Sequence, residues 1–225
     1  MTESRTRDDR ILDHIGLYRL SIRPIIERLF FDEKNCGNVI QRLLDQNRIQ
    51  SREGLPRRMR YYQLSPNEAK SRGIPVHRTQ PFGSQALNHH LAVLWFCNMG
   101  SQPRHLLEKQ EQEKRFPEDL PAGAYCIERS PDGHRLYRFK IGSSDTDDTS
   151  LIRWLRHEIT ASSKSEALMQ PMKTRQFGFG VLVDTTTRVT ALQQTIEESS
   201  LAEDAFIFVE FAPSHLTLHT ALNPK

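Results

Sequence analysis

The chain has 225 residues, which is enough for one large domain or two smaller ones that each bury a hydrophobic core. Its three cysteines, Cys36, Cys97 and Cys126, are far apart and lack metal-ligand spacing, so we expect reduced thiols, with no disulfide framework and no metal site. No apolar run is long enough to span a membrane, and no basic and apolar leader opens the sequence. The expected protein is therefore soluble and cytoplasmic.

The formal net charge of +3 is too small to indicate a partner, but its distribution along the chain is uneven. Residues 1–80 hold sixteen Lys and Arg against ten Asp and Glu, so they carry +6 and the remainder carries −3. A basic N-terminal part is typical of nucleic-acid binding.

Apolar residues recur with helical spacing in three N-terminal segments, residues 10–20, 22–31 and 36–47. Ser21 is predicted to cap the second helix and Asn35 the third, because their short polar side chains can accept from free backbone N–H groups. Asn47 is placed where the third helix should end in a left-handed residue. Ser65, followed by a proline, predicts the start of a further helical turn.

Two short strand-like runs follow the third helix within residues 48–64, on either side of the turn signal Glu53-Gly54-Leu55-Pro56. Three helices followed by a basic hairpin are typical of a winged helix-turn-helix domain, to which we assign residues 1–76.

The polar side of the third helix predicts contacts with DNA bases, since Asn and Gln pair with adenine edges and Arg with guanine in the major groove. The residues concerned are Asn35, Asn38, Gln41 and Arg42. The hairpin arginines suit phosphates, which supply affinity without sequence choice; they are Arg52, Arg57, Arg58 and Arg60, with Arg48 beside them. Two alternatives remain open, namely an ordinary solvated surface and a protein-docking face.

Residues 77–83 lack periodicity and predict a linker. Residues 85–99 predict a helix that is apolar around most of its girth, as helices buried between domains or against a second subunit are. A homodimer through this helix would use its apolar stripe, Leu87, Leu91, Leu94 and Trp95.

The remaining sequence, residues 84–225, predicts an α/β domain with a mixed sheet. Strands are expected at residues 124–130, 134–142, 177–185 and 205–211, and further helices at 151–159 and 189–199. The turn Ser130-Pro131-Asp132-Gly133 predicts a hairpin between the first two strands. Residues 100–121 are charged and fit a helix or an edge strand, and residues 160–174 are read as a polar stretch.

Taken together, these segments resemble the replication-relaxation family of bacterial plasmid and mobile-element proteins. The resemblance rests on YYQLSPNEAK at the end of the winged helix, on NHHLAVLWF, and on FGFGVLVDTTTRVTALQQTIEES with AFIFVEF near the end of the chain. It implies a winged helix joined to a domain similar to the restriction-endonuclease fold, and an association with plasmid DNA relaxation and replication.

A nuclease of that fold needs carboxylates on neighbouring strands to hold Mg²⁺, with a lysine nearby. Here Pro121-Ala122 stands where a Pro-Asp would lie, and Arg138-Phe139-Lys140 occupies the place of a Glu-x-Lys. Asp145, Asp147 and Asp148 are read as loop and helix-start residues. We therefore predict no catalytic residues, no metal and no cofactor.

The sequence thus predicts a non-enzymatic, sequence-selective double-stranded DNA-binding protein, associated with the nucleoid or a plasmid and acting in replication, relaxation or transcription control. Two alternatives remain: a Mg²⁺-dependent nuclease or nickase with its acidic residues elsewhere, and an adaptor whose winged helix docks a protein.

Overall fold

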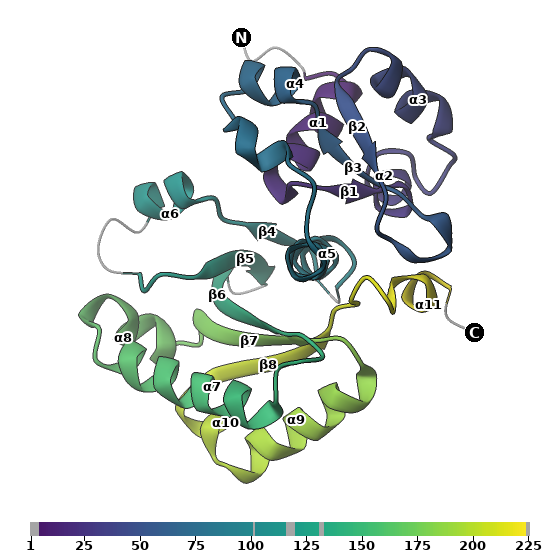
Figure 1. Ribbon diagram of the computed structural model, residues 1–225. Coiled ribbons are helices and arrows are strands. Elements are labelled where there is room, and N and C mark those ends of the chain that lie inside the picture. The colour runs from purple at the N-terminus through teal and green to yellow at the C-terminus, as the bar shows by residue number, and fades with distance from the viewer. Residues whose placement is uncertain (1–4, 101, 116–119, 131–132, 224–225) are drawn as a thin grey trace. The chain divides into compact units, whose positions relative to one another are not determined.

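The computed structural model describes residues 5–100, 102–115, 120–130 and 133–223, which form a mixed α/β structure with two sheets (Figure 1). The chain divides into two compact units. Unit 1 holds the residues up to 94 together with the C-terminal segment from 214, and unit 2 holds residues 95–213. The division falls within helix α5 (Ser84–Asn98), whereas the sequence analysis places the linker at 77–83.

Unit 1 is built from short helices around a three-stranded antiparallel sheet with the order β1-β3-β2. Its elements are α1 (Arg7–Tyr18), β1 (Ser21–Ile22), α2 (Arg23–Phe30), α3 (Gly37–Asp45), β2 (Ile49–Arg52), the 3-10 turn η1 (Pro56–Arg58), β3 (Tyr61–Leu64), α4 (Pro66–Ser71), the 3-10 turn η2 (Val76–Thr79) and α11 (Leu218–Leu222). The helices bury one apolar stripe each, which includes Ile11, Ile15, Ile26, Ile40 and Leu43.

The predicted cap at Ser21 is wrong. Ser21 lies in β1 opposite Tyr62, is fully buried, and its hydroxyl lies 3.1 Å from Nε2 of His14. Helix α2 begins after Ile22 without a side-chain cap. The sheet pairing therefore outweighs the local capping preference of serine.

Of the other three predicted helix-end residues, one is wrong and two are confirmed. Asn35 is not the cap of α3, which follows Cys36; its Oδ1 instead accepts from the backbone N–H of Gly37 at 2.7 Å. Ser65 is confirmed as the cap of α4, and its hydroxyl accepts from the N–H of Glu68. Asn47 is confirmed as a left-handed residue, with φ 52°.

Unit 2 contains one mixed sheet of order β4-β5-β6-β7-β8. Its elements after α5 are β4 (Arg104–Leu106), α6 (Lys109–Arg115), β5 (Ala124–Ser130), β6 (Gly133–Gly142), α7 (Asp148–Ser163), α8 (Glu166–Lys173), β7 (Phe177–Val183), α9 (Thr186–Glu198), α10 (Leu201–Asp204) and β8 (Phe206–Phe211). Strands β4, β5 and β6 pair antiparallel, while β7 and β8 continue the sheet in parallel.

The predicted strands and the two crossover helices of unit 2 are confirmed, as is the β5–β6 hairpin, although its turn residue Asp132 lies outside the described residues. Residues 100–121 are expected to form a helix or an edge strand, and their described part contains both, β4 and α6. Helices α8 and α10 are not predicted by the sequence pattern. Residues 160–174, predicted as a polar stretch, instead hold the end of α7 and the whole of α8, with Pro171 inside α8.

One face of the large sheet is covered by α7, α8, α9 and α10 (Figure 1). Leu155 of α7 is fully buried there. The rings of Trp154 and Phe179 pack edge to face, with their centres 6.4 Å apart. On the opposite face, Gly178 and Gly180 leave room for the side chains of Phe206 and Phe208. A Cβ at either glycine would approach Phe206 or Phe208 too closely, so β7 needs glycine there.

A buried guanidinium joins the two outer strands of this sheet. Arg104 of β4 donates from Nε to Glu128 of β5 at 2.9 Å and from Nη1 to Glu210 of β8 at 2.9 Å. Its charged group also lies 4.0 Å from the ring centre of Phe96. Burial would lower the pKa of Arg104, but its bonds to Glu210 and the charges of both carboxylates raise it, so the arginine stays charged.

We predict that Arg104→Met lowers the free energy of unfolding of unit 2 by about 3–5 kcal/mol, because two carboxylates lose their counter-ion in a buried site. Urea unfolding followed by tryptophan fluorescence measures this unit, since both tryptophans, Trp95 and Trp154, belong to it. The control is Arg129→Met on β5, where the exposed side chain should change stability by no more than about 0.5 kcal/mol. Equal effects of the two changes would contradict the role of Arg104.

Candidate nucleic-acid interface

Three of the residues predicted to contact bases are exposed on helix α3, namely Asn38, Gln41 and Arg42. Gln41 donates to Asp45 one turn later at 2.8 Å. Nη2 of Arg42 reaches both carboxylate oxygens of Asp8 at 2.8 Å, which ties α3 to the start of α1. Asn38 has no side-chain partner within the part of the chain that is described. The helix therefore carries one free amide and two polar groups held in surface pairs.

The connection between β2 and β3 places two neighbouring arginines in a left-handed backbone. Arg57 has φ 52° and Arg58 has φ 60°, and both side chains are exposed. Leu55 just before them is buried and anchors the connection to unit 1. A left-handed backbone costs a non-glycine residue roughly 1–2 kcal/mol. The loop thus keeps two arginines where glycines would be less strained.

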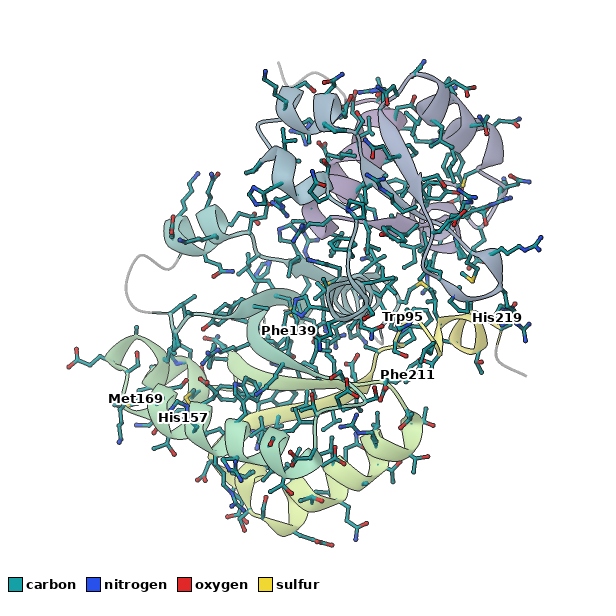
Figure 2. All side chains as sticks on the ribbon, in the orientation of Figure 1. Trp95, Phe139, His157, Met169, Phe211 and His219 are labelled. Carbon is teal, nitrogen blue, oxygen red and sulfur yellow. The ribbon has the colours of Figure 1, made fainter. Side chains whose placement is uncertain are left out.

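The two left-handed arginines differ in their surroundings. Nη1 of Arg57 lies 3.1 Å from Nε2 of His219 in α11, which belongs to the C-terminal segment of unit 1 (Figure 2). The same segment is held to α5, since Oδ1 of Asn88 accepts from the backbone N–H of His215 at 2.7 Å. Arg58 has no side-chain partner among the residues described.

The other hairpin arginines are engaged within unit 1. Arg60 pairs with Glu53 at 2.8 Å on the surface, where both side chains are at least half exposed. Arg52 is half-buried and donates to Gln50 and to the carbonyl of Thr79.

Arg48, at the start of the hairpin, is part of an ion network that joins β2 to α1 and α4. It pairs with Glu68 at 3.0 Å, and this hydrogen bond raises the pKa of Arg48. Arg72, which follows the last residue of α4, pairs with Glu68 as well, and also with Asp9 and Asp13 of α1. The network shows that Arg48 stabilises unit 1 and leaves few donors for an outside ligand.

Of the predicted interface residues, Asn35, Asn38, Arg57 and Arg58 are exposed and have the fewest of their donor groups engaged. Sequence reasoning missed His219, because no local pattern links α11 to the hairpin. It also missed the left-handed conformation of the arginines, although the flanking Gly54 and Pro56 indicated a turn.

The acidic loop of unit 2 is occupied by structural contacts. Asp147 caps α7 by accepting from Ser150, and these hydrogen bonds lower the pKa of Asp147. Asp148 and Asp184 both pair with Arg188 of α9. Burial would lower the pKa of Arg188, but the two carboxylates outweigh it and raise the value. Among the described residues, no group of three His, Cys, Asp or Glu is arranged to hold a metal ion.

The positions compared with a nuclease site are also filled. Arg138 pairs with the buried Glu158 of α7 and donates to the carbonyl of Ala122 at 2.7 Å. The ammonium of Lys140 lies 5.6 Å from the ring centre of Trp154.

The apolar stripe of α5 is covered within the chain itself. Leu87, Leu91 and Leu94 are exposed by 3% or less, and Trp95 by 8%. The homodimer predicted through this helix stays a prediction. None of the described helices has both the length and the apolar character that crossing a membrane requires.

Three comparisons with known proteins find no match: no protein-family model, no curated protein and no solved structure matches this chain. The resemblance to the replication-relaxation family therefore stays a prediction.

We predict that Arg58→Gly is more stable than Arg58→Ala by about 1 kcal/mol, since glycine adopts a left-handed backbone without strain. Hydrogen exchange of the β2 and β3 amides reports the opening of unit 1 and measures the difference. The same two replacements at the exposed helical residue Lys70 provide the control, where glycine should be less stable than alanine by about 1 kcal/mol. If the glycine and alanine variants rank in the same order of stability at Arg58 and at Lys70, the backbone strain inferred at Arg58 is contradicted.

Proposed function

We propose that unit 1 is a winged helix-turn-helix that binds double-stranded DNA. The order of its elements supports this: α1, β1, α2, α3 and then the β2–β3 hairpin, with β3 in the middle of the sheet. In this arrangement α3 is the recognition helix that enters the major groove, and the β2–β3 connection is the wing that contacts the phosphate backbone.

The observation that carries the proposal is the pair of strained, exposed arginines, Arg57 and Arg58. Backbone strain persists where the surrounding structure holds it, and it concentrates at binding sites. Two guanidinium groups at the tip of a hairpin suit phosphates, because each can form charge-assisted hydrogen bonds with phosphate oxygens.

Helix α3 supports a contribution from base contacts. Asn38 has a free amide, and an asparagine on a recognition helix can bind adenine through two hydrogen bonds. Arg42 is tied to Asp8, but its side chain is 51% exposed, and surface ion pairs contribute only about 0–1 kcal/mol. A phosphate or a guanine edge can therefore compete with Asp8 for this arginine.

We assign no catalytic step to unit 2. Its acidic loop is used for a helix cap and for the Arg188 ion pairs, and Arg138 occupies a position at which a nuclease needs a carboxylate. Control of plasmid replication, relaxation or transcription is the biological setting proposed from the family resemblance. A protein-docking adaptor is the alternative that a lack of DNA binding would favour.

We predict that Arg57→Ala with Arg58→Ala weakens duplex binding to a similar degree on all sequences and flattens its salt dependence. Each lost phosphate contact should reduce the slope of log affinity against log salt by about 0.9. Fluorescence anisotropy with labelled duplexes over a series of salt concentrations measures both effects.

The matched control is Lys109→Ala with Lys114→Ala, which removes the same charge from exposed positions of α6 in unit 2. This control separates contact at the wing from a change in overall charge. An unchanged slope in the Arg57 and Arg58 variant would exclude the wing from DNA contact.

We also predict that the protein does not nick supercoiled plasmid with Mg²⁺ or Mn²⁺ beyond a buffer control. The matched variant is Asp147→Ala with Asp148→Ala, which removes two carboxylates of the acidic loop. Nicking by the wild type that disappears in this variant would establish a nuclease in place of the non-enzymatic protein.

A further inference from the structure

The large sheet of unit 2 ends in two outer strands of different character. Strand β4 has 3 residues, contains Arg104, and is preceded by Pro103, as in edge strands protected against pairing. Strand β8 at the other edge has 6 residues, and all of them except Glu210 are apolar. No described segment of the chain pairs with the free side of β8.

One hydrogen bond shows which backbone N–H and C=O groups of β8 point toward β7 and which point to the open edge. The N–H of Ala212 donates to the carbonyl of Val183 in β7 at 2.8 Å. Backbone groups alternate between the two sides of a strand, so those of Phe208 and Glu210 also point toward β7. The N–H and C=O groups of Ile207, Val209 and Phe211 consequently point to the open edge.

We propose that β8 pairs antiparallel with β8 of a second copy of this chain, about a two-fold axis through Val209, to form one continuous sheet. In this register Ile207 lies opposite Phe211 of the second copy, and Val209 lies opposite itself. Every outward N–H then faces an outward C=O, which an antiparallel pair requires.

Side chains in this register are compatible as well. On one face, the pairs Ile207 with Phe211 and Val209 with Val209 are apolar, and such cross-strand pairs stabilise a sheet. On the other face, Glu210 lies opposite Phe208 of the second copy. Each Glu210 is paired with Arg104 of its own chain, and in this register the two Glu210 residues do not lie directly opposite each other.

The side chains of β8 are only partly covered within the chain. Phe211 lies at the end of β8, and its ring packs edge to face against Trp95 with the ring centres 6.2 Å apart (Figure 2). Its side chain is half-buried, as are those of Phe206, Ile207 and Phe208, while Val209 is buried. Partial exposure along an apolar strand is the state expected of an interface that a second strand completes.

Sedimentation velocity of the full chain at increasing protein concentration tests the proposal. We expect a monomer–dimer equilibrium for the wild type. Ile207→Lys should weaken dimerisation by about tenfold or more, because a two-fold axis repeats the lost apolar pair on both sides. The control Thr190→Lys adds the same charge on an exposed position of α9 and should dimerise like the wild type.

A rescue experiment tests the register. Ile207→Lys combined with Phe211→Glu should restore dimerisation, because the introduced lysine of each copy then lies opposite the introduced glutamate of the other. Circular dichroism and tryptophan fluorescence verify that each variant is folded.

A wild type that stays monomeric at every concentration would overturn the proposal, as would a double variant that is folded but no more dimeric than Ile207→Lys. The readout does not involve DNA and is independent of the function proposed for unit 1.

Discussion

The guanidinium of Arg104 holds together parts of unit 2 that are far apart in both the sequence and the sheet. It binds Glu128 on the adjacent strand and Glu210 on the opposite outer strand, and it lies against the ring of Phe96. The side chain of Arg104 is only 3% exposed, so its loss would leave both carboxylates without their counter-ion in a buried site and would lower the free energy of unfolding. The glycines of β7 and the phenylalanines of β8 lie on the same face of the sheet as this ion cluster, and the ring of Phe208 lies beside Arg104.

Unit 1 uses its charges in a different way, because most of its arginines are exposed or half-exposed. Arg48 and Arg72 stabilise the packing of α1, β2 and α4 through shared carboxylates, while Arg57 and Arg58 are placed on a strained turn without such a network. Charges that stabilise the fold and charges available to a ligand are thus separated within one small unit. This separation narrows the proposed DNA contacts from the whole basic hairpin to its tip and to α3.

The proposed functions of the two units are complementary but rest on different features. A single winged helix reads only a few base pairs, and a two-fold dimer through β8 would supply a second reader for a paired half-site. The dimer surface predicted from the sequence was the stripe of α5, and that stripe is buried within the chain. We propose the open edge of β8 as a dimer surface, since an edge strand keeps its outward backbone groups unpaired even when its side chains are partly covered.

The sequence by itself determined the helices and strands whose apolar residues follow a clear period, the hairpin of β5 and β6, and helix ends set by local chemistry, such as Ser65 and Asn47. It did not determine which arginines are free. Their partners are distant in the sequence: Arg42 meets Asp8, Arg57 meets His219, and Arg104 meets Glu210. Ser21 likewise became a strand residue because it pairs with Tyr62. Only the tertiary structure decided these points, because long-range packing and ion pairing depend on the folded positions of residues, whereas caps and periodicity depend on neighbours along the chain.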